Sequence, residues 1–311
     1  MTPRGPVTVE EIVADVESWR GRAVSIRPLA NGLTNANYRV DVDGRAFVVR
    51  IPGASTDLLA IDRANELHNG RIAAALGIGP AILRHFPESG ATVAEFLPGR
   101  PMTNATLAEP GMPARISETL RTLHRGPRFL RDFDMLALAE RYRALAHERG
   151  FPLPAGYAAR RPAVDRIRSA LAAWSLPTVP CHNDLLADNY IDQDGRLRIV
   201  DWEYSGNGDP AFELGNTCRE LDYDAGRLEE LCRAYFGTAT ASLLGRVRLH
   251  MIVSDVGWAL WAAIQRSISR ISFDFDAYGA ARWARAEAAI DGAEFPRWLA
   301  AAAGPPGAGF R

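Results

Sequence analysis

Side chains that could accept a proton and hold a metal ion lie close together between residues 181 and 203, in the stretch CHNDLLADNYIDQDGRLRIVDWE. His182, Asp184 and Asn189 form the pattern H-x-D-x-x-x-x-N, and Asp201 stands at the end of the apolar run that follows. A carboxylate can orient a hydroxyl nucleophile, while an amide oxygen and a second carboxylate can hold Mg²⁺. The pattern therefore predicts phosphoryl transfer that depends on magnesium.

These four residues can be given separate roles. Asp184 is the candidate for orienting and deprotonating an acceptor alcohol, Asn189 for a metal ligand, and Asp201 for the main magnesium ligand, which bridges the nucleotide phosphates. We assign His182 to bracing the loop by hydrogen bonds rather than to acting as the base. A His-x-Asp pair alone more often marks a structural loop, but the added Asn189 and the strand-terminal Asp201 favour catalysis.

The N-terminal part of the chain predicts a small antiparallel sheet. Strands are expected at 24–29, 36–42 and 45–51. Asp43-Gly44 forms the tight turn between the last two strands, and a helix that begins with the capping box at Thr8 and runs to Trp19 precedes them. The loop at 30–35 contains one glycine and small polar residues, so its backbone N–H groups can approach a phosphate. Taken alone, such a loop is more often an ordinary hairpin connection.

Two charged residues of this part could serve a nucleotide. Arg50 ends the third strand, where a cation could reach the α- and β-phosphates. Glu66 lies in a helix predicted from Asp57 to Leu76 and could hold Arg50 by an ion pair. A surface arginine and a solvated glutamate are the ordinary alternatives, so these two residues count only together with the other features.

A connector divides the chain into two predicted lobes. A second hairpin at 81–86 and 91–95 leads into EFLPG, whose proline and glycine break the pattern. We place a nucleotide-binding N-lobe at residues 1–97, a catalytic and acceptor-binding C-lobe at 98–303, and a flexible tail at 304–311. The C-lobe should be mainly helical, with helices at 113–124, 135–148, 160–174, 213–221, 243–268 and 276–290.

Charge and composition exclude some classes of protein. The chain has a formal net charge of −1 and a pI of about 6.6, without the basic stripe of a nucleic-acid binder. Its three cysteines lack metal-ligand spacing and fit a reducing compartment. No apolar run reaches the roughly 18 to 20 residues of a membrane span, and the N-terminus lacks an apolar signal core. We therefore expect a cytoplasmic protein with a small-molecule partner, no nucleic acid and no membrane insertion.

Four segments together resemble the choline/ethanolamine kinase family, within the larger aminoglycoside-phosphotransferase and protein-kinase-like group. They are LANGLTNANYRV with FVVRI, EFLPGRPM, CHNDLLADNYI with IVDWEYSGNGDPAFELGNTCREL, and GWALWAAIQRSIS with SFDFDAYGAARWA. The most specific part is DWEY followed by GDP and CRE. The resemblance implies an α+β, protein-kinase-like fold of two lobes: a small N-lobe with an antiparallel sheet plus helix, and a larger, mainly helical C-lobe. It also implies ATP and Mg²⁺ as cofactors.

The resemblance assigns roles in the catalytic segment position by position. Asp184 matches the catalytic base, and Asn189 and Asp201 match magnesium ligands. Glu203 matches a glutamate that supports the metal site.

The resemblance also assigns the nucleotide contacts. Thr34 and Asn35 match the phosphate loop, which has fewer glycines than that of a protein kinase. Arg50 stands where protein kinases carry lysine, as is usual for the choline-kinase branch. Phe96 and Leu97 would back the adenine, with their main chain offering hydrogen bonds.

A site for choline would need aromatic faces and nearby negative charge, because a quaternary ammonium group donates no hydrogen bonds. Trp258 and Trp261 are three residues apart on one helical face, and Glu220 and Tyr223 are likewise three apart on another predicted helix. Such a tryptophan pair is more often core than cage, so it indicates a cage only together with Glu220 and the kinase-like stretch. By resemblance, the choline pocket is lined by Tyr204, Glu220, Tyr223, Trp258, Trp261, Phe273 and Tyr278.

These features predict a kinase that transfers the γ-phosphoryl group of ATP to choline or a related amino alcohol, and a homodimer is compatible with them. Choline and ethanolamine stay unranked, since Glu220 could serve either substrate. The alternative is a phosphotransferase of the same fold for an aminoglycoside, sugar or homoserine-like alcohol, which would use several carboxylates in place of stacked aromatics. An inactive binding protein on this fold is disfavoured because all the catalytic positions are filled.

Overall fold

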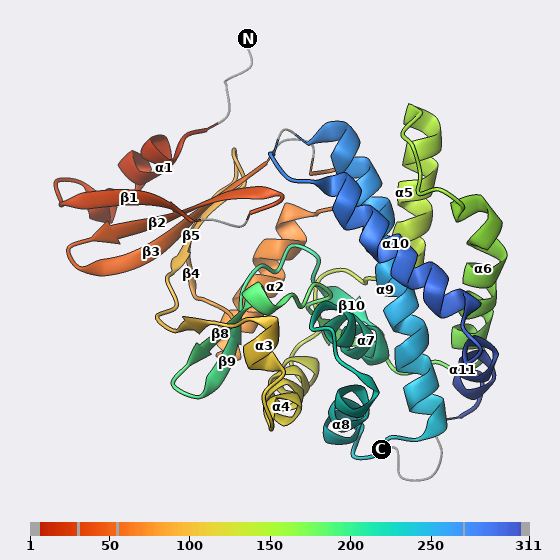
Figure 1. Ribbon diagram of the computed structural model, residues 1–311. Coiled ribbons are helices and arrows are strands. Elements are labelled where there is room, and N and C mark those ends of the chain that lie inside the picture. Colours follow the sequence, from red (N-terminus) through yellow and green to blue (C-terminus); the bar gives the residue numbers. More distant parts are fainter. Residues whose placement is uncertain (1–6, 30–31, 54–55, 270, 306–311) are drawn as a thin grey trace.

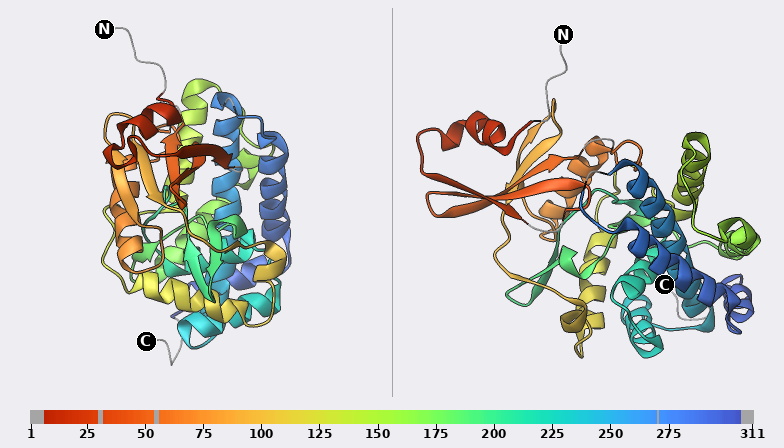
Figure 2. Two further views of the ribbon diagram at one scale, coloured as in Figure 1. Left: turned by 90° about the vertical axis from the view of Figure 1, so that its left-hand side faces the viewer. Right: turned by 45° about the horizontal axis from the view of Figure 1, so that its top comes forward.

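The chain folds into two lobes in a computed structural model that describes residues 7–29, 32–53, 56–269 and 271–305. A sheet forms most of the smaller N-terminal lobe, and helices form most of the larger C-terminal lobe (Figure 1, with two further views in Figure 2). This arrangement confirms the predicted α+β, two-lobed fold. The lobe boundary at residue 97 stays a prediction.

Five antiparallel strands make up the N-lobe sheet. In spatial order they are β1 (Val24–Leu29), β2 (Asn35–Val42), β3 (Arg45–Pro52), β5 (Ala91–Glu95) and β4 (Ile82–Phe86). Asp43 and Gly44 turn β2 into β3 with φ values of 47° and 79°, as the sequence predicts. Side chains alternate along β3, so Phe47 and Val49 are buried on one face while Arg50 points to the C-lobe.

One face of the sheet is covered by α1 (Val9–Asp15) and the short 3₁₀ helix η1 (Glu17–Trp19). The predicted capping box at the start of α1 is present. The prediction of a single helix that runs to Trp19 is wrong, because Val16 adopts an extended conformation between α1 and η1. This break lets Trp19 pack on the sheet, with its ring centroid 5.0 Å from that of Phe47.

The other N-lobe helix, α2 (Arg63–Ala75), begins later than the sequence predicts. Residues 56–60 form turns, and Ala60 has a φ of 62°, which a right-handed helix does not allow. The helix starts after Asp62, whose side chain accepts the N–H groups of Ala64 and Asn65 at 3.0 and 3.1 Å. Leu59, in the turn, is buried in the core of the C-lobe instead.

Short strands carry the catalytic segment of the C-lobe. The strand β7 (Val179–Cys181) pairs with β10 (Gly206–Gly208), and β8 (Tyr190–Gln193) lies between β6 (Arg100–Pro101) and β9 (Arg196–Ile199). The 3₁₀ helix η2 (Ala187–Asn189) leads into β8. The loop after β7 and the turn after β9 therefore lie side by side.

Helices form the rest of the C-lobe. They are α3 (Asn104–Leu107), α4 (Met112–His124), α5 (Met135–Arg149), α6 (Tyr157–Ala173), α7 (Pro210–Glu220), α8 (Ala225–Phe236), α9 (Ala241–Ile268), α10 (Phe275–Asp291) and α11 (Phe295–Ala302). The sequence predicts most of them to within a few residues but misses α3, α8 and α11. In the predicted tail, the Gly304 carbonyl accepts a hydrogen bond from the Ser242 hydroxyl at 2.6 Å. Residues 306–311 of this tail lie outside the described residues.

The long helix α9 is the centre of the C-lobe and packs against α5, α7, α10 and α11 (Figure 1). Its 28 residues, with a mean hydropathy of 1.2 in the most apolar window, have the length and composition of a membrane span. The sequence predicts no run of that length. Because 89% of the window is buried inside the protein, the helix uses its apolar residues for packing.

Gly215 lets α7 approach α9 closely, which makes it a test of this core. A Cβ atom here would lie 2.8 Å from the Val247 carbonyl oxygen and 2.9 Å from the His250 Cβ. We expect Gly215→Ala to lower the free energy of unfolding by about 1–3 kcal/mol, because the helices must move apart. Gly226→Ala, on the exposed side of α8, is the matched control and should be neutral or stabilising. Urea unfolding measures both, and an unchanged Gly215→Ala protein would contradict the close packing.

Candidate active site

A buried carboxylate holds the loop that follows β7. Glu213 of α7 is fully buried, and its two oxygens accept the backbone N–H groups of His182 and Asn183, each at 2.7 Å. Burial alone would raise the pKa of Glu213, but His124, 3.6 Å away, and the backbone donors outweigh it and lower the pKa. The carboxylate thus stays charged and fixes the loop backbone. The sequence reasoning missed Glu213, although an acidic residue within the apolar face of a helix is a signal.

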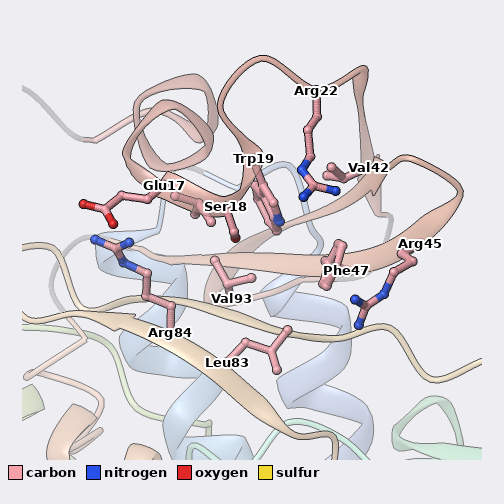
Figure 3. Close-up of a pocket in the computed structure, with 11 residues that line it drawn as sticks. Glu17, Ser18, Trp19, Arg22, Val42, Arg45, Phe47, Leu83, Arg84 and Val93 are labelled. Carbon is pink, nitrogen blue, oxygen red and sulfur yellow. The ribbon is translucent and has the colours of Figure 1, made fainter.

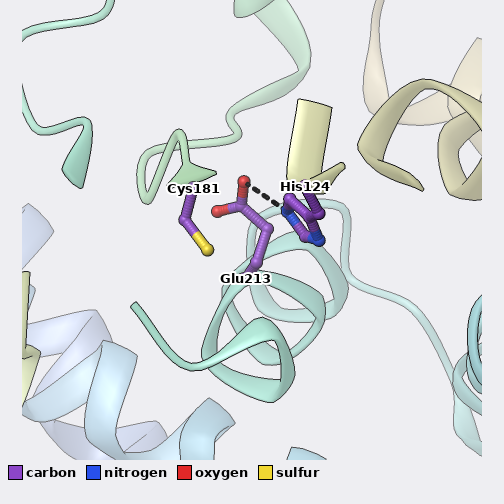
Figure 4. Close-up of side chains that lie close together, drawn as sticks. All are labelled: His124, Cys181 and Glu213. Atoms are coloured by element: carbon purple, nitrogen blue, oxygen red, sulfur yellow. Dashed lines mark ion pairs between the residues drawn. The ribbon is translucent and has the colours of Figure 1, made fainter. Parts of the chain in front are cut away.

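His124, Cys181 and Glu213 gather around this carboxylate in the interior (Figure 4). Their ligand atoms lie within 4.8 Å of one another, a spacing that could suit a metal ion. Most of these groups have other partners, however, although His124 Nε2 has no hydrogen-bond partner among the described residues. His124 Nδ1 lies 2.6 Å from the Tyr235 hydroxyl, and both Glu213 oxygens accept backbone donors. Burial raises the pKa of Cys181, so its sulfur keeps its proton, and we assign the cluster to positioning the loop.

His182 braces the loop with both ring nitrogens. Its Nδ1 accepts the Asp184 backbone N–H at 3.3 Å, which places the ring proton on Nε2. That Nε2 lies 2.9 Å from the Val200 carbonyl and donates to it. Burial lowers the pKa of His182, which favours this neutral ring. An imidazole engaged at both nitrogens supports the loop and is not free to act as the base.

Asp184 and Asn189 lie at opposite ends of one short loop and are tied together. The Asn189 Nδ2 donates to the Asp184 backbone carbonyl at 2.8 Å, which orients the amide and leaves its oxygen for a metal ion. Burial raises the pKa of Asp184 well above its usual range, and the neighbouring carboxylates add to this shift. A carboxylate with a raised pKa is the stronger base toward an alcohol.

Asp201 is held beside Asn189. The N–H of Val200, the preceding residue, donates to the Asn189 carbonyl at 3.0 Å. Asp201 itself has a φ of 69°, and its side chain is 31% exposed. Asp201 and Asn189 thus offer a carboxylate and an amide oxygen with room for phosphate oxygens, which is a donor set that fits Mg²⁺.

Arg50 connects the N-lobe sheet to this segment. Its Nη2 lies 2.6 Å from Asp201 and 3.0 Å from Glu203. Its Nη1 lies 2.8 Å from Glu66, so the predicted Arg50–Glu66 ion pair is confirmed. Burial alone would lower the pKa of Arg50, but these three carboxylates outweigh it and raise the pKa. The guanidinium is therefore always charged and stands where it can reach nucleotide phosphates.

Glu203 is buried under the predicted phosphate loop. It accepts the Thr34 hydroxyl at 2.6 Å and the Asn35 side-chain amide at 2.9 Å. Arg63, which the sequence reasoning missed, lies 3.3 Å from the same carboxylate. These donors, with Arg50, occupy Glu203 in this structure, so its geometry fits support of the metal site better than direct ligation. The side chains of Thr34 and Asn35 point to Glu203, and residues 30–31 of the loop lie outside the described residues.

The predicted adenine contacts lie in the connector after β5. The Phe96 N–H donates to the Ala46 carbonyl at 3.4 Å, and the Arg39 guanidinium carbon lies 4.4 Å from the centroid of the Phe96 ring. Leu97 is buried. Their contact with adenine stays a prediction.

Aromatic residues from three segments meet beside Asp201. The Tyr204 ring centroid lies 5.0 Å from that of Trp258, and the Tyr204 hydroxyl accepts the Trp261 indole N–H at 2.8 Å. Tyr278 contacts both Trp261 and Phe273 at centroid distances of 5.8 Å. The structure thus brings together five of the seven predicted acceptor residues. Trp258 and Trp261 are only 3% and 4% exposed, whereas Phe273 is 40% exposed.

Glu220, the predicted acid of the acceptor site, is paired with a cation of the protein itself. Arg282 on α10 binds its two oxygens at 2.6 and 2.7 Å, and both side chains are buried. The Arg282 guanidinium also lies 4.3 Å from the centroid of the Tyr278 ring. Asp255 on α9 lies 4.0 Å from Arg282, and burial raises its pKa to about 6. The sequence reasoning missed Arg282 and Asp255.

Tyr223 lies apart from the aromatic cluster. Its predicted place on the helix of Glu220 is wrong, because α7 ends at Glu220 and Asp222 has a φ of 52°. Its hydroxyl donates to the Leu107 carbonyl at 2.6 Å, and its ring belongs to a different hydrophobic cluster. The structure therefore does not bring Tyr223 to the other predicted acceptor residues.

The two-lobed fold, with a carboxylate loop facing a metal-ligand pair and a basic residue from the sheet, defines the class of kinase-like phosphotransferases. The chain belongs to the phosphotransferase enzyme family, which it matches over residues 25–250. It is 31% identical over 300 residues to ethanolamine kinase 2 of Mus musculus, covering 85% of this chain and 76% of that protein.

Solved structures agree with this family. A choline/ethanolamine kinase family protein from Mesorhizobium loti has a TM-score of 0.82 and 36% identity, covering 94% of this chain and 96% of that one. LicA in complex with AMP has a TM-score of 0.75 at 24% identity, covering 90% and 97%, and shows the fold. The protein is thus an ATP-dependent phosphotransferase that acts on an alcohol acceptor.

The opposite charges of Glu220 and Arg282 lead to a prediction for how turnover depends on pH. Glu220 raises the pKa of Asp184, whereas Arg282 lowers it. Because Asp184 accepts a proton only when ionised, turnover should fall as the pH drops through its raised pKa. Arg282→Gln should move this acidic limb to higher pH, and Glu220→Gln should move it to lower pH. Profiles of kcat against pH at saturating substrate measure both variants.

The control for this experiment is Arg266→Gln, which removes an arginine from a half-exposed ion pair on α9. Its profile should match that of the wild type. Shifts of the same sign in Arg282→Gln and Glu220→Gln would contradict the assignment of Asp184.

Proposed function

We propose that the protein transfers the γ-phosphoryl group of magnesium-bound ATP to the hydroxyl of choline or a related amino alcohol such as ethanolamine. The contact that carries this proposal joins the two halves of the site. Tyr204, three residues after Asp201, packs on Trp258 and accepts a hydrogen bond from Trp261. The segment that we propose to bind the metal ion is thus connected directly to aromatic rings of a kind suited to an ammonium group. The names of the relatives, ethanolamine kinase and choline/ethanolamine kinase, support the same acceptor.

In this proposal Asp184 orients the acceptor hydroxyl and takes its proton as the new phosphorus–oxygen bond forms. Asn189 and Asp201 would hold the magnesium ion, which would supply positive charge to the phosphoryl group being transferred. Arg50 releases Asp201 and turns to the phosphates while Glu66 keeps hold of it. These steps use only groups that already lie at the junction of the lobes.

The remaining nucleotide contacts come from the N-lobe. Thr34 and Asn35 hold their loop against Glu203, so the loop presents backbone N–H groups to the phosphates. Phe96 and Leu97 back the adenine from the connector. Glu203 supports the metal site through Arg50.

The aromatic rings, rather than a free acid, supply most of the affinity for an ammonium group in this proposal. Each open aromatic face contributes roughly 0.5–2 kcal/mol. Glu220 is already neutralised by Arg282, although its oxygens keep lone pairs that could accept from ethanolamine. An aminoglycoside with several ammonium groups would meet Arg282 and find no unpaired acid at Glu220, which disfavours that alternative.

The proposal places the enzyme in the cytoplasm, where ATP is available. Cys181, Cys218 and Cys232 are buried free thiols, which fits a reducing compartment. A homodimer is compatible with the proposal, and sedimentation would measure it.

Removing the proposed base or metal ligand tests the reaction. Asp184→Asn and Asp201→Asn should each reduce turnover by about 10²–10⁴-fold, because each acts on the transition state or its metal ion. Their melting temperatures should stay near that of the wild type. Asp194→Asn, in the exposed turn between β8 and β9, is the matched control and should keep full activity.

The readout is ADP release with magnesium and a panel of acceptors: choline, ethanolamine, dimethylethanolamine, an aminoglycoside and a sugar. We expect a response to the amino alcohols. Wild-type turnover in either variant would refute the assigned roles, and a response to the aminoglycoside or sugar alone would favour the alternative acceptor.

The aromatic cluster is tested by trimming its rings without emptying the core. Trp258→Phe and Trp261→Phe should each raise the KM for choline by at least about 2-fold, because a phenylalanine ring attracts a cation less strongly than an indole ring does. The KM for ATP should not change. Trp283→Phe is the control, since Trp283 is equally buried but packs on Tyr157 outside the cluster. Equal rises in both Michaelis constants would rule out the cage.

A further inference from the structure

A pocket of about 480 Å³ opens on the N-lobe between η1 and the sheet (Figure 3). This volume lies within the range typical of small-molecule sites. Val42, Phe47 and Val93 from three strands form its apolar floor, and all three are buried. Because side chains alternate along β3, Phe47 faces this pocket and Arg50 faces the opposite side of the sheet. The pocket is therefore separate from the candidate active site.

Guanidinium groups surround the apolar floor. Arg22, Arg45 and Arg84 line the pocket, and Glu17 is the only acidic residue among its lining residues. Among the described residues Arg45 has no ion pair, and its guanidinium carbon lies 5.4 Å from the centroid of the Phe47 ring. The lining residues thus carry three positive charges and one negative charge, and Asp43 and Asp15 lie close to two of the three arginines.

The other two arginines have partners that a ligand could replace. Arg22 pairs with Asp43 at 3.0 Å, and both of these side chains are about half exposed. Arg84 lies 3.8 Å from Asp15, a distance too long for a hydrogen bond. Exposed pairs of this kind contribute at most about 1 kcal/mol, so they compete weakly with a bound anion.

Trp19 adds a further donor to the pocket. The residue lines the pocket and is 6% exposed. Figure 3 shows the indole nitrogen on the side of Arg22 and Phe47. An acceptor atom bound there would receive this N–H together with a guanidinium group. The site is therefore rich in donors and poor in acceptors.

We propose that this pocket binds an amphipathic organic anion, with an apolar body and one carboxylate or phosphate group. The body would lie on Val42, Phe47 and Val93, and the charged group would be bound by the guanidinium groups. A neutral apolar compound would leave the donors unpaired, and an inorganic anion would leave the apolar floor open to water. Only the combination matches both parts of the lining.

Calorimetric titration of the protein tests this site with four probes. Decanoate and decyl phosphate carry the two candidate head groups, while decanol lacks the charge and inorganic phosphate lacks the body. At least one of the first two should bind, and the last two should bind about 10-fold more weakly or not at all, a difference of about 1.4 kcal/mol. Binding of neither decyl anion, or equal binding of decanol, would overturn the proposal.

Variants and competition locate the binding. The double variant Arg45→Ala, Arg84→Ala should weaken binding of the decyl anion by about 10-fold or more. Arg45 is exposed and Arg84 is partly exposed, so their loss should leave the fold intact. Arg27→Ala, at an exposed ion pair on β1, is the matched control and should bind as the wild type does. Excess magnesium-ADP should not displace the probe. Displacement of the probe by magnesium-ADP, or unchanged binding by the double variant, would show that the probe binds elsewhere and would refute the site.

Discussion

The pairing of buried charges between the lobes is the constraint on which the rest of the structure depends. Glu66, Asp201 and Glu203 approach one another at the junction, and carboxylates cannot be buried together without cations. Arg50 contacts all three, and Arg63 contacts Glu66 and Glu203. Because Arg50 comes from β3 while Asp201 and Glu203 follow β9, the same contacts fix how the N-lobe sheet meets the segment that we propose to be catalytic. Assembly of the lobes and assembly of the site are therefore one event.

The carboxylates of this network also differ in how far they are buried, and this difference suits a reaction. Glu203 is almost fully buried and keeps four donors, whereas the Asp201 side chain is 31% exposed. A ligand can therefore reach Asp201 without opening the rest. If Nη2 of Arg50 leaves Asp201 for a phosphate, the pairing of Nη1 with Glu66 still holds Arg50 at the junction of the lobes. One ion pair is thus available for exchange, while the others preserve the junction of the lobes.

The sequence predicts those parts of the fold and site that local patterns determine. Alternation and the Asp43-Gly44 turn predict the sheet, and spacing alone places Asp184 and Asn189 on one loop. Local patterns do not show a partner 30 residues away, which is why Glu213 was missed as the group that holds the loop backbone. Local patterns also do not predict where a residue other than glycine turns the chain by adopting a positive φ. Asp222 does so after α7, and the predicted place of Tyr223 was wrong for that reason.

The proximity of the proposed acceptor site to Asp184 limits how an ammonium group could be recognised there. Each additional carboxylate near Asp184 would raise its pKa further, as Glu220 already does, and would leave less of the base ionised at neutral pH. Arg282 offsets this effect, but it also removes the net negative charge that would attract a cation. Aromatic rings avoid the conflict, because they attract an ammonium group through their π faces and carry no net charge. In the proposed acceptor site, aromatic rings can therefore bind a cation near Asp184 without weakening this carboxylate as a base.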